Sequence, residues 1–275
     1  MCDWKSGCRE NDCSKKILKK AAQAGKKCSV VCASGVSCEP YNGIARIVHS
    51  QYGLQTCELP GQLLVDRALS RKNIVDDILD IKILVWDEIS MSSKRIFELV
   101  HILHHFLSKN DMPFGGIQVI LVGDFWQLKP VRTMLDRGSP VFHSKLFDDA
   151  FPHRVELKEV KRQHESEIEL KNALDKIREG ECDEDTEAYF HSLNRVCKPR
   201  DGVNDVLHIY FKKLPVEIHN IDVLSGIPGA LIVLKSTDTG CAQQLERTIS
   251  STLTLKEGCN VMLLYNISRH LRNGC

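Results

Sequence analysis

The 275-residue sequence lacks several features that would assign it to a class at once. It has no C-x-x-C pair, and no apolar stretch approaches the roughly 18 residues of a transmembrane helix. Its first 16 residues are polar and include acids, unlike a secretory signal or a typical transit peptide. These absences favour a soluble nuclear protein, with mitochondria as the alternative location, and predict no membrane partner.

Charge of one sign is also lacking. The formal net charge is +1, so no global field draws the chain to a polyanion, and nucleic-acid affinity would need a local basic groove. A run of lysines on the helix expected over 14–27 is more typical of a solvated helix face than of a DNA-binding stripe. These lysines are Lys15, Lys16, Lys19 and Lys20.

Metal-binding side chains are present but poorly spaced. Of the twelve cysteines, Cys28 and Cys32 share an expected strand, where four residues span about 13 Å, too far for one metal ion. We therefore expect reduced, mostly buried thiols rather than a zinc site or disulfides. His101, His104 and His105 fall away from the apolar stripe of their helix and are expected to face solvent.

Three continuous apolar runs predict strands that are buried on both faces, at 28–33, 81–86 and 117–122. Between the last two runs, apolar residues recur at helical spacing from Ile96 to Leu107. A helix between two buried strands is a βαβ unit, which indicates a doubly wound α/β domain with a parallel sheet.

The second half of the chain predicts a further domain. A helix is expected over 165–179 and is closed by Gly180, and the polar stretch after it places a domain boundary near residue 200. A strand (206–211), a helix (215–224) and another strand (231–234) then begin a second α/β unit. We expect a first domain over 1–200 and a partial second domain over 201–275.

Acids follow two of the apolar runs. Asp87 and Glu88 end the run at 81–86, and Asp124 follows the next strand. Ligands of an open parallel sheet bind at the carboxyl ends of its strands, where carboxylates can hold hydrated Mg²⁺ and orient a water for attack on a phosphate. Gln127 is placed to sense a terminal phosphate. The alternative is that the acids cap the following helices.

Several stretches share their pattern with one family. They are CASGVSC with ARIVHS (32–38, 45–50), LVWDEISM (84–91), LVGDFWQLKPV (121–131), VELKEVKRQ (155–163), LHIYFKKLPVEIHN (207–220) and LKEGCNVMLLYN with LRNG (within 255–274). In this order they resemble the Pif1-like helicases of superfamily 1B over nearly the whole chain. An ordered set of matches is far more specific than any single match.

The resemblance implies a RecA-like domain followed by the start of a second one. It also implies ATP-dependent 5′ to 3′ unwinding of single-stranded or forked DNA, in repair, recombination or telomere maintenance, with ATP and Mg²⁺ as cofactors. The catalytic residues would be Asp87, Glu88, Gln127 and Arg162. Asp87 would hold Mg²⁺, with Ser14 as a second ligand, and Asp124 would belong to the cofactor site. We assume a monomer.

The same resemblance implies a groove for a single strand. Ser34, Gly35 and His49 belong to the segments that would line it, where amides and hydroxyls contact phosphates. Trp126 is a candidate for stacking on a base, although a core position is about as frequent for tryptophan.

The phosphate-binding loop departs from the family pattern. Against G-x-x-x-x-G-K-[ST], Gly7 and Ser14 fit, but Asp12 replaces the second glycine and Cys13 the lysine. Asp12 would set a negative charge against the phosphates, and Cys13 cannot replace the ammonium group. The second hypothesis is therefore a non-catalytic, helicase-derived nucleic-acid-binding remnant, or an incomplete gene model of an active enzyme.

Overall fold

The structure is a computed structural model that describes residues 2–4, 10–54, 59–157, 163–195, 207–237, 250–264, 267 and 271. Contacts divide the chain into two units, one running to Tyr189 and one starting at Phe190. The boundary expected near residue 200 lies outside the described residues, so it stays a prediction. Within the described ranges, no helix combines the length and apolar character needed to cross a membrane.

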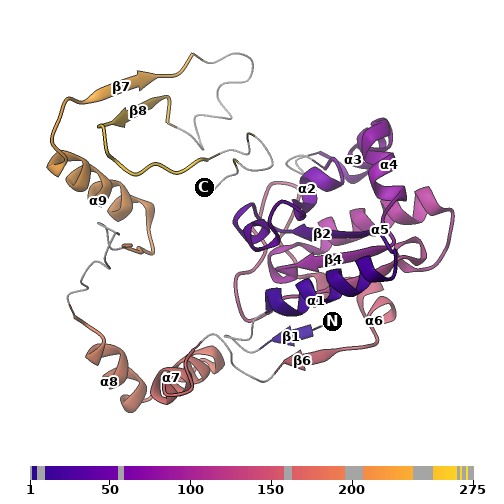
Figure 1. The fold of residues 1–275 in the computed structure, drawn as a ribbon, viewed down its shortest axis with the longest axis horizontal. Coiled ribbons are helices and arrows are strands. Elements are labelled where there is room, and N and C mark those ends of the chain that lie inside the picture. The colour runs from indigo at the N-terminus through magenta and orange to yellow at the C-terminus, as the bar shows by residue number, and fades with distance from the viewer. Residues whose placement is uncertain are drawn as a thin grey trace. The chain divides into compact units, whose positions relative to one another are not determined.

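A four-stranded parallel sheet forms the centre of the first unit (Figure 1). Its order is β3 (Arg46–Ile47), β2 (Cys28–Cys32), β4 (Ile83–Asp87) and β5 (Gln118–Leu121). β2 and β4 pair from Cys28 with Ile83 to Cys32 with Asp87, and β4 pairs β5 from Ile83 with Gln118. The three strands predicted from apolar runs are confirmed, with their ends shifted by one or two residues.

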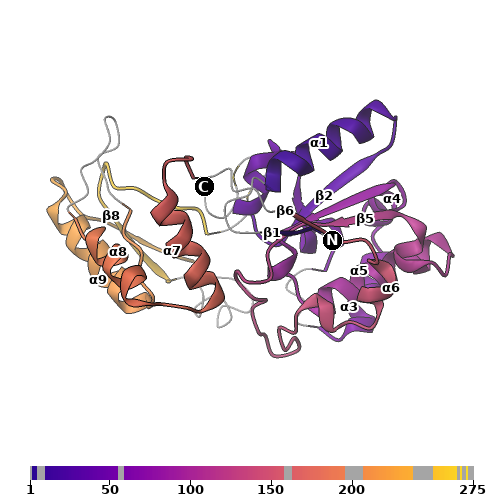
Figure 2. The same ribbon diagram turned by 90° about the horizontal axis from the view of Figure 1, so that it is seen from below.

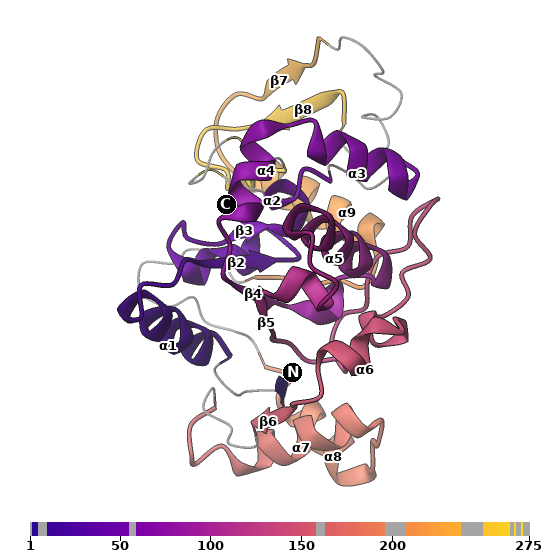
Figure 3. The same ribbon diagram turned by 90° about the vertical axis from the view of Figure 1, so that its right-hand side faces the viewer.

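Helices cover both faces of this sheet, with α1 (Glu10–Gln23) on one side and α5 (Lys94–Ser108) on the other (Figure 3). The α5 side also carries α3 (Gly61–Leu69) and α4 (Lys72–Leu79), and α2 (Val48–Gln51) follows β3. The predicted helix over 14–27 is wrong at both ends, because α1 begins at Glu10 and ends at Gln23.

Alternate residues of the central strands enter two separate cores. Val30 and Val85 pack toward α1, whereas Val31, Leu84 and Trp86 pack toward α5. This follows from the two-residue period of a strand and explains why the runs contain few polar residues. On the α5 side, Phe97 lies 5.2 Å from Phe114 and 6.2 Å from Trp86 between ring centroids.

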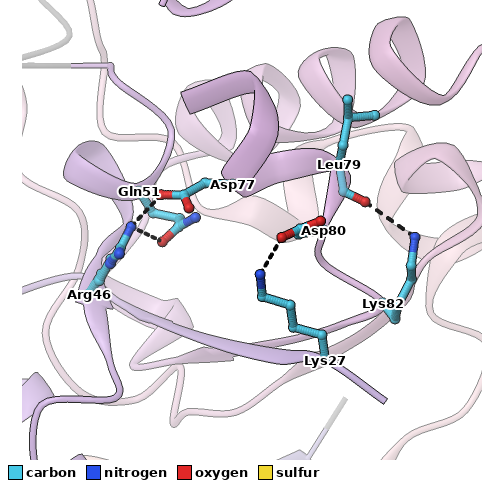
Figure 4. Close-up of polar contacts among 7 residues, drawn as sticks. All are labelled: Lys27, Arg46, Gln51, Asp77, Leu79, Asp80 and Lys82. Atoms are coloured by element: carbon cyan, nitrogen blue, oxygen red, sulfur yellow. Dashed lines mark hydrogen bonds and ion pairs between the residues drawn. The ribbon is translucent and has the colours of Figure 1, made fainter. Parts of the chain in front are cut away.

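Polar contacts fasten α4 to the edge of the sheet (Figure 4). Lys27, just before β2, pairs with Asp80 at the end of α4, and Arg46 Nη1 lies 2.6 Å from Asp77 Oδ2. Arg46 also donates to the Gln51 side-chain oxygen over 3.3 Å. Because these side chains are at least a third exposed, each pair contributes little stability and mainly orients α4.

The histidines of α5 do not face solvent as a group, so that prediction is wrong. His104 is buried, and its Nε2 lies 2.8 Å from the Tyr52 hydroxyl. His101 Nδ1 accepts the Phe114 N–H over 3.0 Å, which ties α5 to the 3-10 helix η3 (Pro113–Gly116). The buried face of α5 is therefore wider than its apolar residues alone indicate, because the His101 and His104 rings form hydrogen bonds within the protein.

The rest of the first unit continues along the chain. The 3-10 helix η4 (Val141–His143) and α6 (Leu146–Ala150) lead into β6 (Val155–Leu157), which pairs in parallel with β1 (Cys2–Trp4; Figure 2). Helix α7 (Ile168–Glu179) lies inside the predicted range and ends at Gly180, whose φ is 81°. Helix α8 (Glu184–Ser192) follows.

The described part of the second unit contains α9 (Lys213–Gly226) and an antiparallel pair, β7 (Ile232–Lys235) with β8 (Thr252–Leu255). The helix and the strand near 231–234 match their predictions. The strand over 206–211 is wrong, because residues 207–211 form no strand and Leu207, Ile209 and Phe211 are exposed. No described residue of this unit is buried.

The described cysteines vary in burial more than expected. Cys32 and Cys38 are buried, whereas Cys182 is exposed and Cys13, Cys28 and Cys259 are intermediate. Burial raises the pKa of the Cys28 thiol to about 11, so this thiol stays protonated at neutral pH.

Candidate nucleotide and metal site

Asp87 ends β4 at the carboxyl edge of the sheet. Its side chain is 2% exposed, and Oδ2 accepts from the Tyr41 hydroxyl over 2.5 Å while Oδ1 accepts from the Glu88 N–H over 3.0 Å. Burial raises the pKa of Asp87, and these two hydrogen bonds oppose that shift. Among the described residues, no cationic side chain pairs with it. A buried carboxylate with only neutral partners suits a site for an added cation.

Ser14, which belongs to α1, lies near Tyr41 and therefore near the same carboxyl edge of the sheet. Its side chain is fully buried, and its hydroxyl has no hydrogen-bond partner among the described residues. It is close enough to Tyr41 to lower the pKa of that phenol, which burial and the Asp87 carboxylate raise more strongly. Tyr41 thus joins Ser14 and Asp87, the two residues predicted to hold Mg²⁺, and their oxygens are ligands of the kind that Mg²⁺ takes.

Tyr41 was missed by the sequence analysis. It ends the 3-10 helix η1 (Val36–Tyr41), which follows β2, and it packs with Val30 and Val85. The 46 positions between Tyr41 and Asp87 conceal the contact, so only the fold reveals it.

Glu88 follows Asp87 in an unusual backbone conformation. Its φ and ψ are 52° and 44°, the left-handed region that a residue with a side chain occupies at a cost. The neighbouring strand holds it there, because Ile89 N–H donates to the Val122 carbonyl over 3.0 Å and Val122 N–H donates to Trp86 over 2.9 Å. Such strain is enriched at functional sites, as expected for a residue that must project a carboxylate from a strand end.

Gly123 makes this junction possible. Its φ is 153°, and a Cβ at this position would lie 2.9 Å from the Ile89 nitrogen. The glycine of the G-D-F-W-Q string therefore permits the close approach of the turn after Asp87. The backbones of two sequence motifs, LVWDEISM and LVGDFWQLKPV, thus lie in direct contact, although some 30 residues separate them in the sequence.

Asp124 has a different environment. It is 1% exposed and forms an ion pair with Arg178 of α7, in which Arg178 Nη2 donates to Oδ1 over 2.8 Å. It also accepts from the Trp126 N–H over 3.0 Å and from the Gln127 side chain over 3.2 Å. A contact between Asp124 and the cofactor, as predicted, would have to compete with these three hydrogen-bond donors for the carboxylate oxygens.

The alternative, in which the acids cap the segments that follow them, holds for Asp124 but not for Asp87 or Glu88. Helix α5 is capped by Ser93, whose hydroxyl accepts the Ile96 N–H over 3.2 Å, and neither Asp87 nor Glu88 caps it. Asp124 does cap the turn that follows it. Arg178 carries no signal in the sequence beyond a cation in the last turn of its helix, so its role was missed.

The residues assigned to the single strand lie on the first unit. Ser34 Oγ lies 2.7 Å from Ser37 Oγ in the turn after β2, and Gly35 precedes η1 in a helical conformation. His49 lies in α2, where burial lowers its pKa and Asp136 opposes the shift. Trp126 is 71% exposed, so the core alternative for it is wrong.

Part of the predicted site falls outside the described residues, namely Arg162, Gly7 and the side chain of Asp12. Cys13 is described. It is partly buried and packs on the core that contains Val30, Val85 and Val122. A neutral thiol at this position cannot supply the positive charge of the family's lysine.

The parallel sheet, the helices on both its faces and the buried acids at its carboxyl edge are the arrangement of a RecA-like domain. Residues 5–188 match the family model of the PIF1-like helicase. Because this match covers more than half of the chain, the chain belongs to the PIF1-like helicase family.

Individual relatives agree with this membership. The chain is 28% identical over 265 residues to the ATP-dependent DNA helicase PIF1 of Candida albicans, a match that covers 90% of this chain and 29% of that protein. It superposes on the crystal structure of Pif1 helicase from Candida albicans with a TM-score of 0.86 and 26% identity, covering 99% of this chain and 63% of that one. For Bacteroides Pif1 bound to ssDNA the TM-score is 0.74 at 25% identity, with 96% and 61% covered.

Proposed function

We propose that this chain is the nucleotide-binding part of a Pif1-like DNA helicase, coupling ATP hydrolysis to 5′ to 3′ movement along single-stranded or forked DNA. The observation that carries the proposal is the buried Asp87 carboxylate, whose partners are neutral, beside the Ser14 hydroxyl that lacks one. Family membership supplies the reaction class, and a role in repair, recombination or telomere maintenance, in the nucleus, accords with it.

Each side chain has a role in this proposal. Asp87 and Ser14 hold Mg²⁺, Glu88 positions and deprotonates the attacking water, and Gln127 contacts the terminal phosphate. Arg162 contacts the nucleotide from outside the described residues. Mg²⁺–ATP, when bound, supplies the reactive phosphoryl group and neutralises its charge.

The experiment is single-stranded-DNA-stimulated ATP hydrolysis by the full chain, with Glu88→Gln as the matched control. We expect activity above that control. A second readout is the Mg²⁺ dependence of binding of a fluorescent ATP analogue, which Ser14→Ala and Asp87→Asn should each weaken. Equal hydrolysis rates in the chain and in Glu88→Gln, with no metal-dependent binding, would refute the enzymatic proposal.

A second candidate is favoured by the position of Cys13. Its partly buried thiol packs against the core at the position that the family pattern gives to the phosphate-binding lysine, so the transition state would lack an important charge. On this reading the chain binds single-stranded DNA and hydrolyses no ATP. DNA binding without any Mg²⁺–nucleotide binding would favour this candidate.

A further inference from the structure

Two cysteines lie beside the acidic edge of the first unit. Cys32 ends β2 and pairs with Asp87 in the sheet, and Cys38 belongs to η1, the 3-10 helix that Tyr41 ends. Both side chains are fully buried in the same core, and both are free thiols. The function proposed above gives neither of them a role.

The chain folds back between these two cysteines, so that their thiols meet. The Cys32 Sγ donates to the Ser37 carbonyl over 3.4 Å, and the Cys38 Sγ donates to the Ser34 carbonyl over 3.4 Å. The two thiols also lie within hydrogen-bonding reach of each other. A disulfide holds its two Cβ atoms about 3.5–4.5 Å apart, and thiols in direct contact are already near that arrangement.

The surroundings keep this pair reduced while η1 stays in place. The hydrogen bond with Cys38 raises the pKa of the Cys32 thiol far above its usual range, and burial and the nearby Asp87 carboxylate raise it further. Because the thiolate is the reactive form, a buried and protonated thiol reacts slowly. Oxidation of the pair therefore depends on opening of the segment that covers it.

The helix η1 is suited to such opening. Its N-cap is Gly35, which supplies no side-chain hydrogen bond, and Pro40 within it lacks a backbone donor. Asn42 ends it in the left-handed conformation, with φ 49°. Hydrogen bonds in a 3-10 helix are also poorer in geometry than those in an α-helix. A short element of this kind opens at a lower cost than the whole domain, which gives a small oxidant access to the thiols.

From these observations we infer that Cys32 and Cys38 are an oxidation site for hydrogen peroxide, and that the disulfide they form displaces Tyr41 from Asp87. One thiolate attacks a peroxide oxygen and becomes a sulfenic acid as the O–O bond breaks, and the hydroxide released takes up the proton of that thiol. The second thiol attacks the sulfenic sulfur, the S–O bond breaks, and another water leaves. The two sulfurs together lose two electrons, which reduce the peroxide to two waters.

The disulfide changes the position of η1 relative to the sheet. It removes both thiol protons, so the two backbone carbonyls that accept them lose these donors. Tyr41 lies one 3-10 turn after Cys38 and moves with it. Asp87 thereby loses the hydrogen bond from the phenol and keeps the one from the Glu88 N–H. The effect on cation binding rests on the proposed function, whereas formation of the disulfide does not.

The first test maps the disulfide in the full chain. The protein is treated with hydrogen peroxide until its free thiols no longer decrease, with circular dichroism to verify the fold, and is then alkylated and digested with trypsin. The peptide 28–46, bounded by Lys27 and Arg46, contains Cys28, Cys32 and Cys38. We expect a disulfide between the last two, which dithiothreitol reduces.

Two controls make this test decisive. The exposed Cys182 reports that peroxide has acted, and if it is oxidised while Cys32 and Cys38 can still be alkylated, the inference is overturned. Cys28→Ser removes the half-buried thiol of β2 and keeps the pair, so its disulfide should form as in the unaltered chain. Loss of the disulfide in Cys28→Ser would show a different pairing and would also overturn the inference.

The second test measures Mg²⁺-dependent binding of a fluorescent ATP analogue before and after oxidation. We expect about tenfold weaker binding in the oxidised chain, because hydrogen-bond partners of a metal ligand commonly contribute about 10–100-fold to metal affinity. Dithiothreitol should restore the binding, and Cys38→Ser should show no response to peroxide. Tyr41→Phe should weaken binding by the reduced chain to a similar extent and should leave little further loss on oxidation.

The outcomes separate this inference from the proposed function. If the disulfide forms and binding of the nucleotide analogue does not change, Tyr41 is not displaced, and the inference fails while the proposed function stands. If the reduced chain shows no Mg²⁺-dependent binding, the proposed function fails, and the peptide map still confirms or overturns the cysteine pair.

Discussion

Asp87 is the last residue of β4, Asp124 follows the end of the adjacent parallel strand β5 by three residues, and both are almost completely buried. Asp87 accepts hydrogen bonds from a phenol and an amide, whereas Asp124 accepts them from a guanidinium, an amide and a side-chain amide. The first carboxylate has no countercharge among the described residues, and the second has one. The difference supports the cation-binding role that we propose for Asp87 and indicates a structural role for Asp124.

The comparison shows how little the local sequence decides at a strand end. Both acids follow an apolar run, and both precede a turn. What separates them is α7, which places Arg178 beside Asp124 from 54 positions away. Substitutions that remove one partner at a time test whether Asp87 and Asp124 differ in their roles.

The largest expected effect is on folding stability. Asp124→Asn should lower the free energy of unfolding by about 3–5 kcal/mol, because it leaves the Arg178 guanidinium, 15% exposed, without its countercharge. Asp87→Asn should change it by about 1 kcal/mol or less, since removal of an unpaired buried charge offsets the weaker hydrogen bonds to Tyr41 and the Glu88 N–H. Urea denaturation of both variants at pH 7 measures the two values. Equal losses would contradict the distinction between the strand ends.

Acidification should act through a third buried group. Burial lowers the pKa of His104 to about 4 from 6.5, so the unfolded chain takes up this proton first. Stability present above pH 6.5 is then lost as the pH falls toward 4, by about 3 kcal/mol. Asp87 acts in the opposite direction, because its pKa is raised and the folded form holds its proton more tightly.

His104→Gln separates these contributions. The amide keeps a hydrogen bond to the Tyr52 hydroxyl but does not titrate. Thermal unfolding at pH 7 and at pH 4.5 should show a smaller loss for His104→Gln than for the unaltered chain. The same loss in both proteins would assign the acid sensitivity to other groups.

A smaller effect is expected where the two strand ends meet. Gly123→Ala should destabilise the fold by about 2 kcal/mol, because the added Cβ meets the Ile89 nitrogen and the backbone conformation is strained. Gly43→Ala is the control, with φ 84° and open space around it. It should cost about 1 kcal/mol. If the two cost the same, the contact with Ile89 carries no energy beyond the backbone term.

The smallest effect on stability is expected at Trp126. Trp126→Ala should change the free energy of unfolding by about 0.5 kcal/mol or less, since the ring is mostly solvent-exposed. Oligo-dT binding should nevertheless weaken by about 1–3 kcal/mol if the ring stacks on a base. Asp124→Asn should weaken it too, because Asp124 holds the Trp126 N–H. Unchanged affinity would remove Trp126 from the strand-binding set.

The sequence allowed the centre of the first unit to be predicted, because its strands are continuous apolar runs that only a doubly covered sheet accommodates. The expectation that Ser14 and Asp87 share one site came only from the family pattern. Tyr41, Arg178 and the burial of His104 were not accessible, since each depends on a contact between segments distant along the chain.

The strand predicted over 206–211 failed for a related reason. Apolar residues alternate there as in a strand, but an extended segment needs a hydrogen-bonded neighbour to become one. Leu207, Ile209 and Phe211 are exposed instead. Periodicity reports which residues prefer burial, and it does not report whether a partner strand lies alongside.

The backbone junction of Ile89 with Val122 has a mechanical consequence. Two peptide hydrogen bonds connect the segments without side chains, so we expect Glu88 and the segment from Gly123 to Gln127 to move together. Force on the exposed Trp126 would then reach Glu88, the proposed general base, through backbone hydrogen bonds that do not depend on side-chain rotamers. We expect force applied to the 125–143 loop to change the orientation of Glu88 before it disturbs the helices that cover the sheet.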